Sequence, residues 1–180
     1  MIDSKAKMTL ESAFQDAIKM LGLPSIPYAF RYEQMGCRFK TMDNAEEVDN
    51  SNHIVYINED WANQMVKAYE YDLHYMMAHE ARHVYQEVIM KMFLSGQLKN
   101  EPEALVVSWI SNKQNYVRNQ GGATVKPYHC QPLEVDADAF ANFYVMIKQI
   151  GGAKIPSDSD ELVTQRLKEI AVQYGAEIRE

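Results

Sequence analysis

A glutamate flanked by two histidines, in the segment His79-Glu80-Ala81-Arg82-His83, has the residue types and spacing of a hydrolytic metal site. On a helix, residues four apart lie on one face, so both imidazoles can bind one metal ion with Glu80 beside its water. This HExxH pattern is typical of zinc hydrolases, in which the glutamate is the general base. In a chain with 5 His among 180 residues, chance would produce the pattern on the order of 0.01 times. The segment therefore predicts zinc ligands at His79 and His83 and a catalytic Glu80.

The surrounding sequence predicts the long helix that this motif needs. Residues 71–94 contain no Gly or Pro, and their apolar residues recur at spacings of three and four. The apolar stripe consists of Leu73, Met77, Ala81, Val84 and Val88. His79 and His83 lie off this stripe, so the helix can bury its apolar side without covering the metal ligands. Arg82 and Gln86 are either anchors to neighbouring elements or ordinary solvated side chains, and the sequence leaves both interpretations open.

A third metal ligand must come from elsewhere in the chain, because a catalytic zinc usually has three protein ligands and one open position. The candidates are Glu134 and His129. Glu134 is favoured because Asp138, one helical turn later, can accept the free N–H of a histidine ligand and orient its ring. The plainer interpretation makes Glu134 an ordinary acidic residue of a first helical turn, with Asp136 and Asp138 on a solvated face. Tyr128 and His129 are the candidate donors to a reaction oxyanion.

The pairing of His79-Glu80-x-x-His83 with Glu134-x-x-x-Asp138 resembles the gluzincin branch of the zincin metallopeptidases. Residues 134–141, after a strand and an HExxH helix, are more narrowly similar to the ImmA/IrrE-type zincin-like peptidases, and the resemblance covers about residues 54–150. It implies a zincin-like fold, a His79, His83 and Glu134 ligand set for Zn²⁺, and hydrolysis of peptide bonds. An extra helix between His83 and Glu134 departs from that family, so repressor cleavage is not the expected activity.

The remaining sequence predicts a small sheet and several packing helices. Apolar spacing and capping residues predict helices at residues 9–21, from about 61, at 102–117, 133–150 and 158–174, with Asn58 or Asp60 and Ser157 as caps. β-prone runs predict a hairpin of residues 28–32 and 37–41 and a third strand at 53–57, whereas residues 43–52 and 121–132 are expected to be loops. These elements indicate a single α+β domain over residues 1–180 with a small antiparallel or mixed sheet. In the zincin arrangement, the strand at 53–57 would line the cleft.

Composition restricts the partners of this protein. A net charge of −7 and a pI near 5.3 argue against a nucleic-acid partner, because phosphate binding needs a basic surface. Residues 1–10 lack the apolar core of a signal peptide, and no apolar run approaches the roughly 20 residues of a membrane span. We therefore expect a cytoplasmic protein with no membrane association and with Cys37 and Cys130 reduced. The expected partner is a peptide or protein substrate, and the oligomeric state is left open.

Two alternatives to a peptidase remain at this point. One is a non-catalytic zincin-fold module that binds a protein partner, and the other is a zinc hydrolase of a non-peptide amide. Glu80 argues against the first, because a purely structural metal site needs no general base between its histidines. An enclosed pocket in place of an open groove would favour the second.

Overall fold

The computed structural model describes residues 1–24, 27–42, 45–97, 100–119 and 122–176. Within them the helices are α1 (Ser4–Met20), α2 (Glu59–Ala68), α3 (Glu70–Leu94), α4 (Glu103–Gln114), α5 (Val125–His129), α6 (Pro132–Ile147) and α7 (Asp160–Gln173), with a short 3-10 turn, η1 (Gly122–Thr124), before α5. The strands are β1 (Ala29–Glu33), β2 (Glu46–Asp49) and β3 (Ile54–Asn58). The predicted α+β class and the small mixed sheet are confirmed.

The sheet has the strand order β1-β3-β2, so β3 is central and β2 lies at an edge. β1 runs parallel to β3, and β2 runs antiparallel to it with Glu46 opposite Ile57. The predicted hairpin of residues 28–32 and 37–41 is therefore wrong, and the hairpin partner of β3 comes from the acidic stretch expected to be a loop. Residues 43–44 of that stretch lie outside the described residues. Strand propensity mostly reflects packing, and the 37–41 segment buries only Phe39 while Val48 of β2 packs beside Val55.

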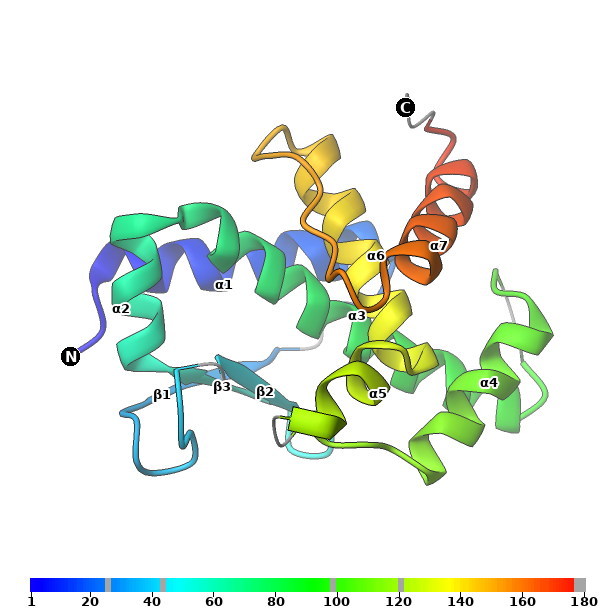
Figure 1. Ribbon diagram of the computed structural model, residues 1–180, viewed down its shortest axis with the longest axis horizontal. Helices are drawn as coiled ribbons and strands as arrows, with labels where there is room; N and C mark the ends of the chain where they lie inside the picture. The colour runs from blue at the N-terminus through cyan, green and yellow to red at the C-terminus, as the bar shows by residue number, and fades with distance from the viewer. Residues whose placement is uncertain (25–26, 43–44, 98–99, 120–121, 177–180) are drawn as a thin grey trace.

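α3 runs through the middle of the molecule and carries the HExxH segment, with the sheet and α2 in one half and α4 and α7 in the other (Figure 1). α1 and α6 both pack against α3, and α7 packs on α6. Apolar side chains from these four helices and from β3 share one buried core. In the part of the chain that the structure describes, no helix is long and apolar enough to cross a membrane.

Several helix ends differ from the sequence-based expectation. α1 begins before residue 9 because the Asp3 carboxylate accepts hydrogen bonds from the backbone N–H groups of Lys5 and Ala6. Asn58, one of the two predicted caps of α2, is the residue that caps it. Ser157 does not cap the last helix, since α7 begins at Asp160. The expected loop at 121–132 contains η1 and α5, and its first residue, Gly121, lies outside the described part.

Candidate metal centre

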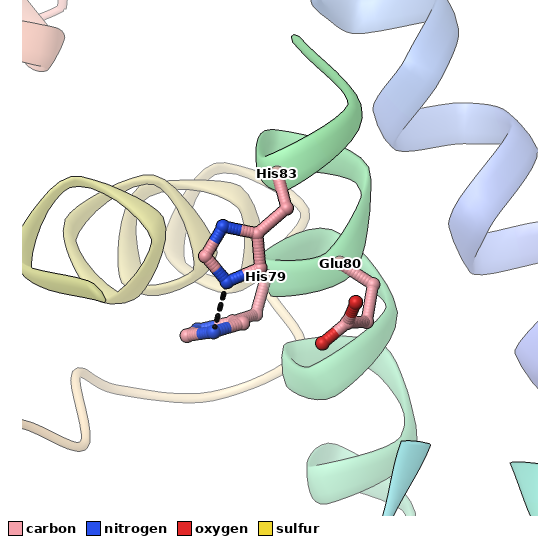
Figure 2. A group of neighbouring side chains, drawn as sticks. All are labelled: His79, Glu80 and His83. Carbon is pink, nitrogen blue, oxygen red and sulfur yellow. Dashed lines mark hydrogen bonds between the residues drawn. The ribbon is translucent and has the colours of Figure 1, made fainter. Parts of the chain in front are cut away.

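His79 and His83 project from the same side of α3, as their spacing predicts (Figure 2). Their Nε2 atoms lie 3.0 Å apart. The side chain of His79 is 9% exposed and that of His83 is 20% exposed, so water or a substrate can reach the pair from the His83 side. Glu80 belongs to the same group, in which one ligand atom from each residue lies within 4.8 Å of the others.

Glu134 of α6 completes a triangle with the two histidines. Its Oε2 lies 3.3 Å from His79 Nε2, and its Oε1 lies 3.5 Å from His83 Nε2. Zinc bonds of about 2.0–2.1 Å in tetrahedral geometry place neighbouring ligand atoms about 3.3 Å apart. The separations of 3.0, 3.3 and 3.5 Å lie close to that value, with Glu134 approaching His79 through Oε2 and His83 through Oε1. These three side chains therefore fit a tetrahedral zinc ion with one coordination position left open.

The His79 ring is oriented by Asp138, one turn after Glu134 on α6. His79 Nδ1 lies 2.9 Å from Asp138 Oδ1, which also accepts a hydrogen bond of 2.8 Å from the Tyr75 hydroxyl. A carboxylate only accepts, so the neutral ring carries its proton on Nδ1 and presents the Nε2 lone pair to Glu134 and His83.

The His83 ring is oriented by Gln86, a residue for which the sequence left two interpretations open. His83 Nδ1 lies 2.8 Å from Gln86 Oε1. The Gln86 amide nitrogen donates to the Leu133 carbonyl at 2.9 Å and to Asp136 Oδ2 at 2.7 Å, which fixes the amide with its oxygen toward His83. The neutral His83 ring therefore also carries its proton on Nδ1. When both rings are neutral, the two Nε2 atoms, 3.0 Å apart, direct their lone pairs to the same region, where they can share a proton or a metal ion.

The Glu134 carboxylate has one satisfied and one unsatisfied oxygen. Oε1 accepts a hydrogen bond of 2.7 Å from the Tyr116 hydroxyl, whereas Oε2 is buried with no hydrogen-bond partner among the described residues. Burial disfavours the charged form, but the charge of His83 and the contacts with His79 and Tyr116 outweigh it and hold the pKa of Glu134 far below its usual value. Glu134 is thus ionised, and its buried Oε2, 3.3 Å from His79 Nε2, is placed to bind a metal ion together with that ring.

Glu80 has the electrostatic properties of a general base. It is 8% exposed and projects from the side of α3 next to the histidines (Figure 2). Burial raises the pKa of its carboxyl, and although His83 and His79 oppose this, the pKa remains above its ordinary value. A base whose pKa lies closer to neutrality accepts a proton more readily from a reacting water.

Two adjoining hollows open at these residues. One, of about 590 Å³, is lined by His79, Glu80 and Glu134, and the other, of about 300 Å³, by Glu80, His83 and Glu134. Strand β2 borders both of them through Glu46 and Glu47. The expectation that the strand at 53–57 lines the cleft is therefore wrong, because β3 is bonded on both sides and only the edge strand β2 can face the opening.

The predicted oxyanion donors lie on α5, at the border of the larger hollow. Burial, and next the charge of Glu134, raise the pKa of Tyr128, so its hydroxyl keeps its proton and can donate. Tyr128 lines both hollows and packs edge-to-face against Tyr116, with ring centres 6.3 Å apart. His129 lines only the larger one, and among the described residues it does not join the group of His79 and His83. No local pattern marks Tyr116, which lies within the helix predicted at 102–117, as the residue that donates a hydrogen bond to Glu134.

Asp136 is buried in an ionic network, so the plainer interpretation of the sequence, in which it lies on a solvated face, is wrong. Arg82 binds Asp136 at 2.8 Å and Glu101 at 3.0 Å, while Arg166 binds the same two acids at 2.8 and 3.2 Å. Burial opposes ionisation of Asp136, but Arg82 and Arg166 lower its pKa to about 2. Because Asp136 also holds Gln86, this network connects α7 to the orientation of His83. Arg166 and Glu101 are distant in sequence from the motif, and no local pattern marked them.

No protein-family model, curated protein or solved structure matches the chain. The resemblance to gluzincins and to ImmA/IrrE-type peptidases stays a prediction from motifs, and the function must be argued from the site.

Proposed function

We propose that this protein is a zinc-dependent peptidase with a zincin-like arrangement, in which His79, His83 and Glu134 hold the metal and Glu80 is the general base. The observation that supports this most is the convergence of two histidine Nε2 atoms and one ionised carboxylate, with separations of 3.0 to 3.5 Å. The buried Oε2 of Glu134, which makes no hydrogen bond among the described residues, also supports it. When bound, zinc supplies Lewis acidity that acidifies water and polarises a carbonyl group.

The side chains around the proposed metal site divide the remaining work. Glu80 takes a proton from the attacking water and passes it to the amine that leaves when the peptide bond breaks. Asp138 and Gln86 hold the two imidazoles in the tautomer that leaves Nε2 free. The protonated Tyr128 hydroxyl is the candidate donor to the oxyanion that develops on the carbonyl oxygen.

The edge of the sheet suggests how a peptide is held. β2 is the edge strand beside both hollows, so an extended substrate can add to it through backbone hydrogen bonds. The combined opening has polar walls and faces a strand edge. This shape suits an extended peptide, whereas a small non-peptide amide would be expected in an enclosed pocket. This argument favours peptide hydrolysis over the non-peptide alternative.

The decisive experiment compares Glu80→Gln with wild type on an unstructured peptide library at equal zinc content, with products identified by mass spectrometry. The variant should retain zinc, because all three proposed ligands are intact, and should lose about 10² to 10⁴-fold in rate. Glu103→Gln, on the exposed first turn of α4, removes the same charge away from the site and should behave as wild type. Zinc binding without cleavage by wild type would favour the non-catalytic binding module. Equal cleavage by wild type and Glu80→Gln would exclude Glu80 as the base.

A further inference from the structure

Glu46 occupies a position in β2 at which the sheet otherwise places apolar side chains. Its partner on β3 is Ile57, which is fully buried, and the next residue on the same face, Val48, lies opposite the buried Val55. Side chains opposite one another on neighbouring strands share a face of the sheet. Glu46 therefore points to the inner face of the sheet, toward α3, which β2 contacts.

The Glu46 carboxylate makes no hydrogen bond within the part of the chain that the structure describes. Both of its oxygens are shielded from solvent, although the residue as a whole is partly exposed, and neither has a hydrogen-bond partner among the described residues. Two other acids of the same wall are paired: Glu47 binds Arg38 at 2.9 Å, and Glu87 binds Lys91 at 3.3 Å. A buried carboxylate without a donor destabilises the folded state, and a ligand that supplies N–H groups would remove this cost.

The direction of Glu46 places its carboxylate at the proposed reaction centre. It lines both hollows, and the charges of Glu80 and His79 act on it. Glu46, Glu80 and Glu134 place three carboxyl groups around the larger hollow, and a cation beside Glu46 would favour its ionised form. The cleft can therefore accept a further positive charge beside the metal.

We propose that Glu46 recognises a cationic nitrogen of the substrate, either a lysine or arginine side chain next to the scissile bond or a free α-amino group. This inference rests on the proposed function, since it names the substrate class of the same site. Ammonium or guanidinium N–H groups would satisfy the two shielded oxygens, and the charged pair would offset the burial of the carboxylate. A neutral substrate would leave Glu46 unpaired, and this difference produces the selectivity.

The test measures peptide binding without turnover, in zinc-loaded full-length protein carrying Glu80→Gln. Three fluorescent peptides are compared by anisotropy: one with a central lysine, one with norleucine at that position, and the lysine peptide with an acetylated N-terminus. The lysine peptide should bind about 10 to 100-fold more tightly than the norleucine peptide, as expected for hydrogen bonds to a charged group. Adding Glu46→Gln should remove this difference by weakening only the lysine peptide. Glu103→Gln, which removes the same charge from the exposed first turn of α4, should preserve it.

The acetylated peptide separates the two sources of the cation. If acetylation weakens peptide binding and Glu46→Gln abolishes this effect, Glu46 recognises the α-amino group. If acetylation has no effect and lysine is still preferred over norleucine, Glu46 recognises the side chain. Either result supports recognition of a cation. Equal affinity for all three peptides, no binding of any, or the same loss with Glu103→Gln as with Glu46→Gln would overturn the proposal. Lysine-selective binding by a protein that cleaves nothing would instead contradict the peptidase function alone, and cleavage indifferent to charge would contradict Glu46 recognition alone.

Discussion

Replacing Asp138 by Asn should weaken zinc binding without disturbing any metal ligand. Asp138 Oδ1 accepts from both the Tyr75 hydroxyl and His79 Nδ1. The amide keeps the size of the side chain but loses its charge, and it can present N–H to the ring, which would move the His79 proton to the metal-facing Nε2. Loss of such an orienting partner typically costs about 10 to 100-fold in metal affinity, which is about 1.4 to 2.8 kcal/mol. A hydrogen bond to a charged group typically contributes about 1.5 to 3 kcal/mol, so its loss predicts a similar decrease in zinc affinity.

The assay is competition for zinc against a chromogenic chelator, with circular dichroism to show that the fold is retained. Tyr75→Phe is the matched control, because it removes the other hydrogen bond to Asp138 while leaving the carboxylate on His79. Tyr75→Phe should weaken zinc binding by less than tenfold. Wild-type affinity in a folded Asp138→Asn protein would refute the reasoning, and so would an equal loss in Tyr75→Phe.

Three further predictions test the ligand set and its support. Glu134→Ala should lose most zinc affinity in the same competition assay and His129→Ala should lose none, so the opposite pattern would reassign the third ligand. Asp136→Asn should lower the free energy of unfolding by about 3 to 5 kcal/mol in urea titrations, because it breaks buried ion pairs with Arg82, and a loss below 1 kcal/mol would contradict this. In the zinc-free protein burial opposes protonation of His79, but Asp138 and Glu134 outweigh it and raise its pKa well above the usual value. The stabilisation from the charged ring should therefore be present below about pH 6.5 and be lost as the pH rises through the raised pKa. Zinc must displace that proton, so its apparent affinity should rise about tenfold per pH unit until the pH passes the raised pKa, and a flat profile would contradict the assignment.

Local geometry explains which features were predictable from the sequence. The shared face of His79 and His83 follows from the helical repeat alone, and the long uninterrupted pattern of α3 identified that helix. The same repeat puts Glu134 and Asp136 about 200° apart around α6. It could not tell what each side would meet, because α6 packs between α3 and α7 and is buried from Leu133 to Val145 with few exceptions. The supposed solvated face is therefore an internal ionic network.

Tertiary packing decided the rest of the site. The position of Glu134 beside both histidines and the fixing of Gln86 by Asp136 depend on how α6 docks on α3, which no local pattern records. The sheet was mispredicted for a related reason: strand preference is set by neighbours, so the acidic stretch containing Glu46 became the edge strand through its pairing with β3. The sequence by itself determined the residue types and the helical face that suit a metal, because both are local properties of the chain. Only the packing of distant segments determined the position of the third candidate ligand, Glu134, the orientation of the two histidine rings and the wall of the cleft. These features depend on contacts between residues far apart in sequence.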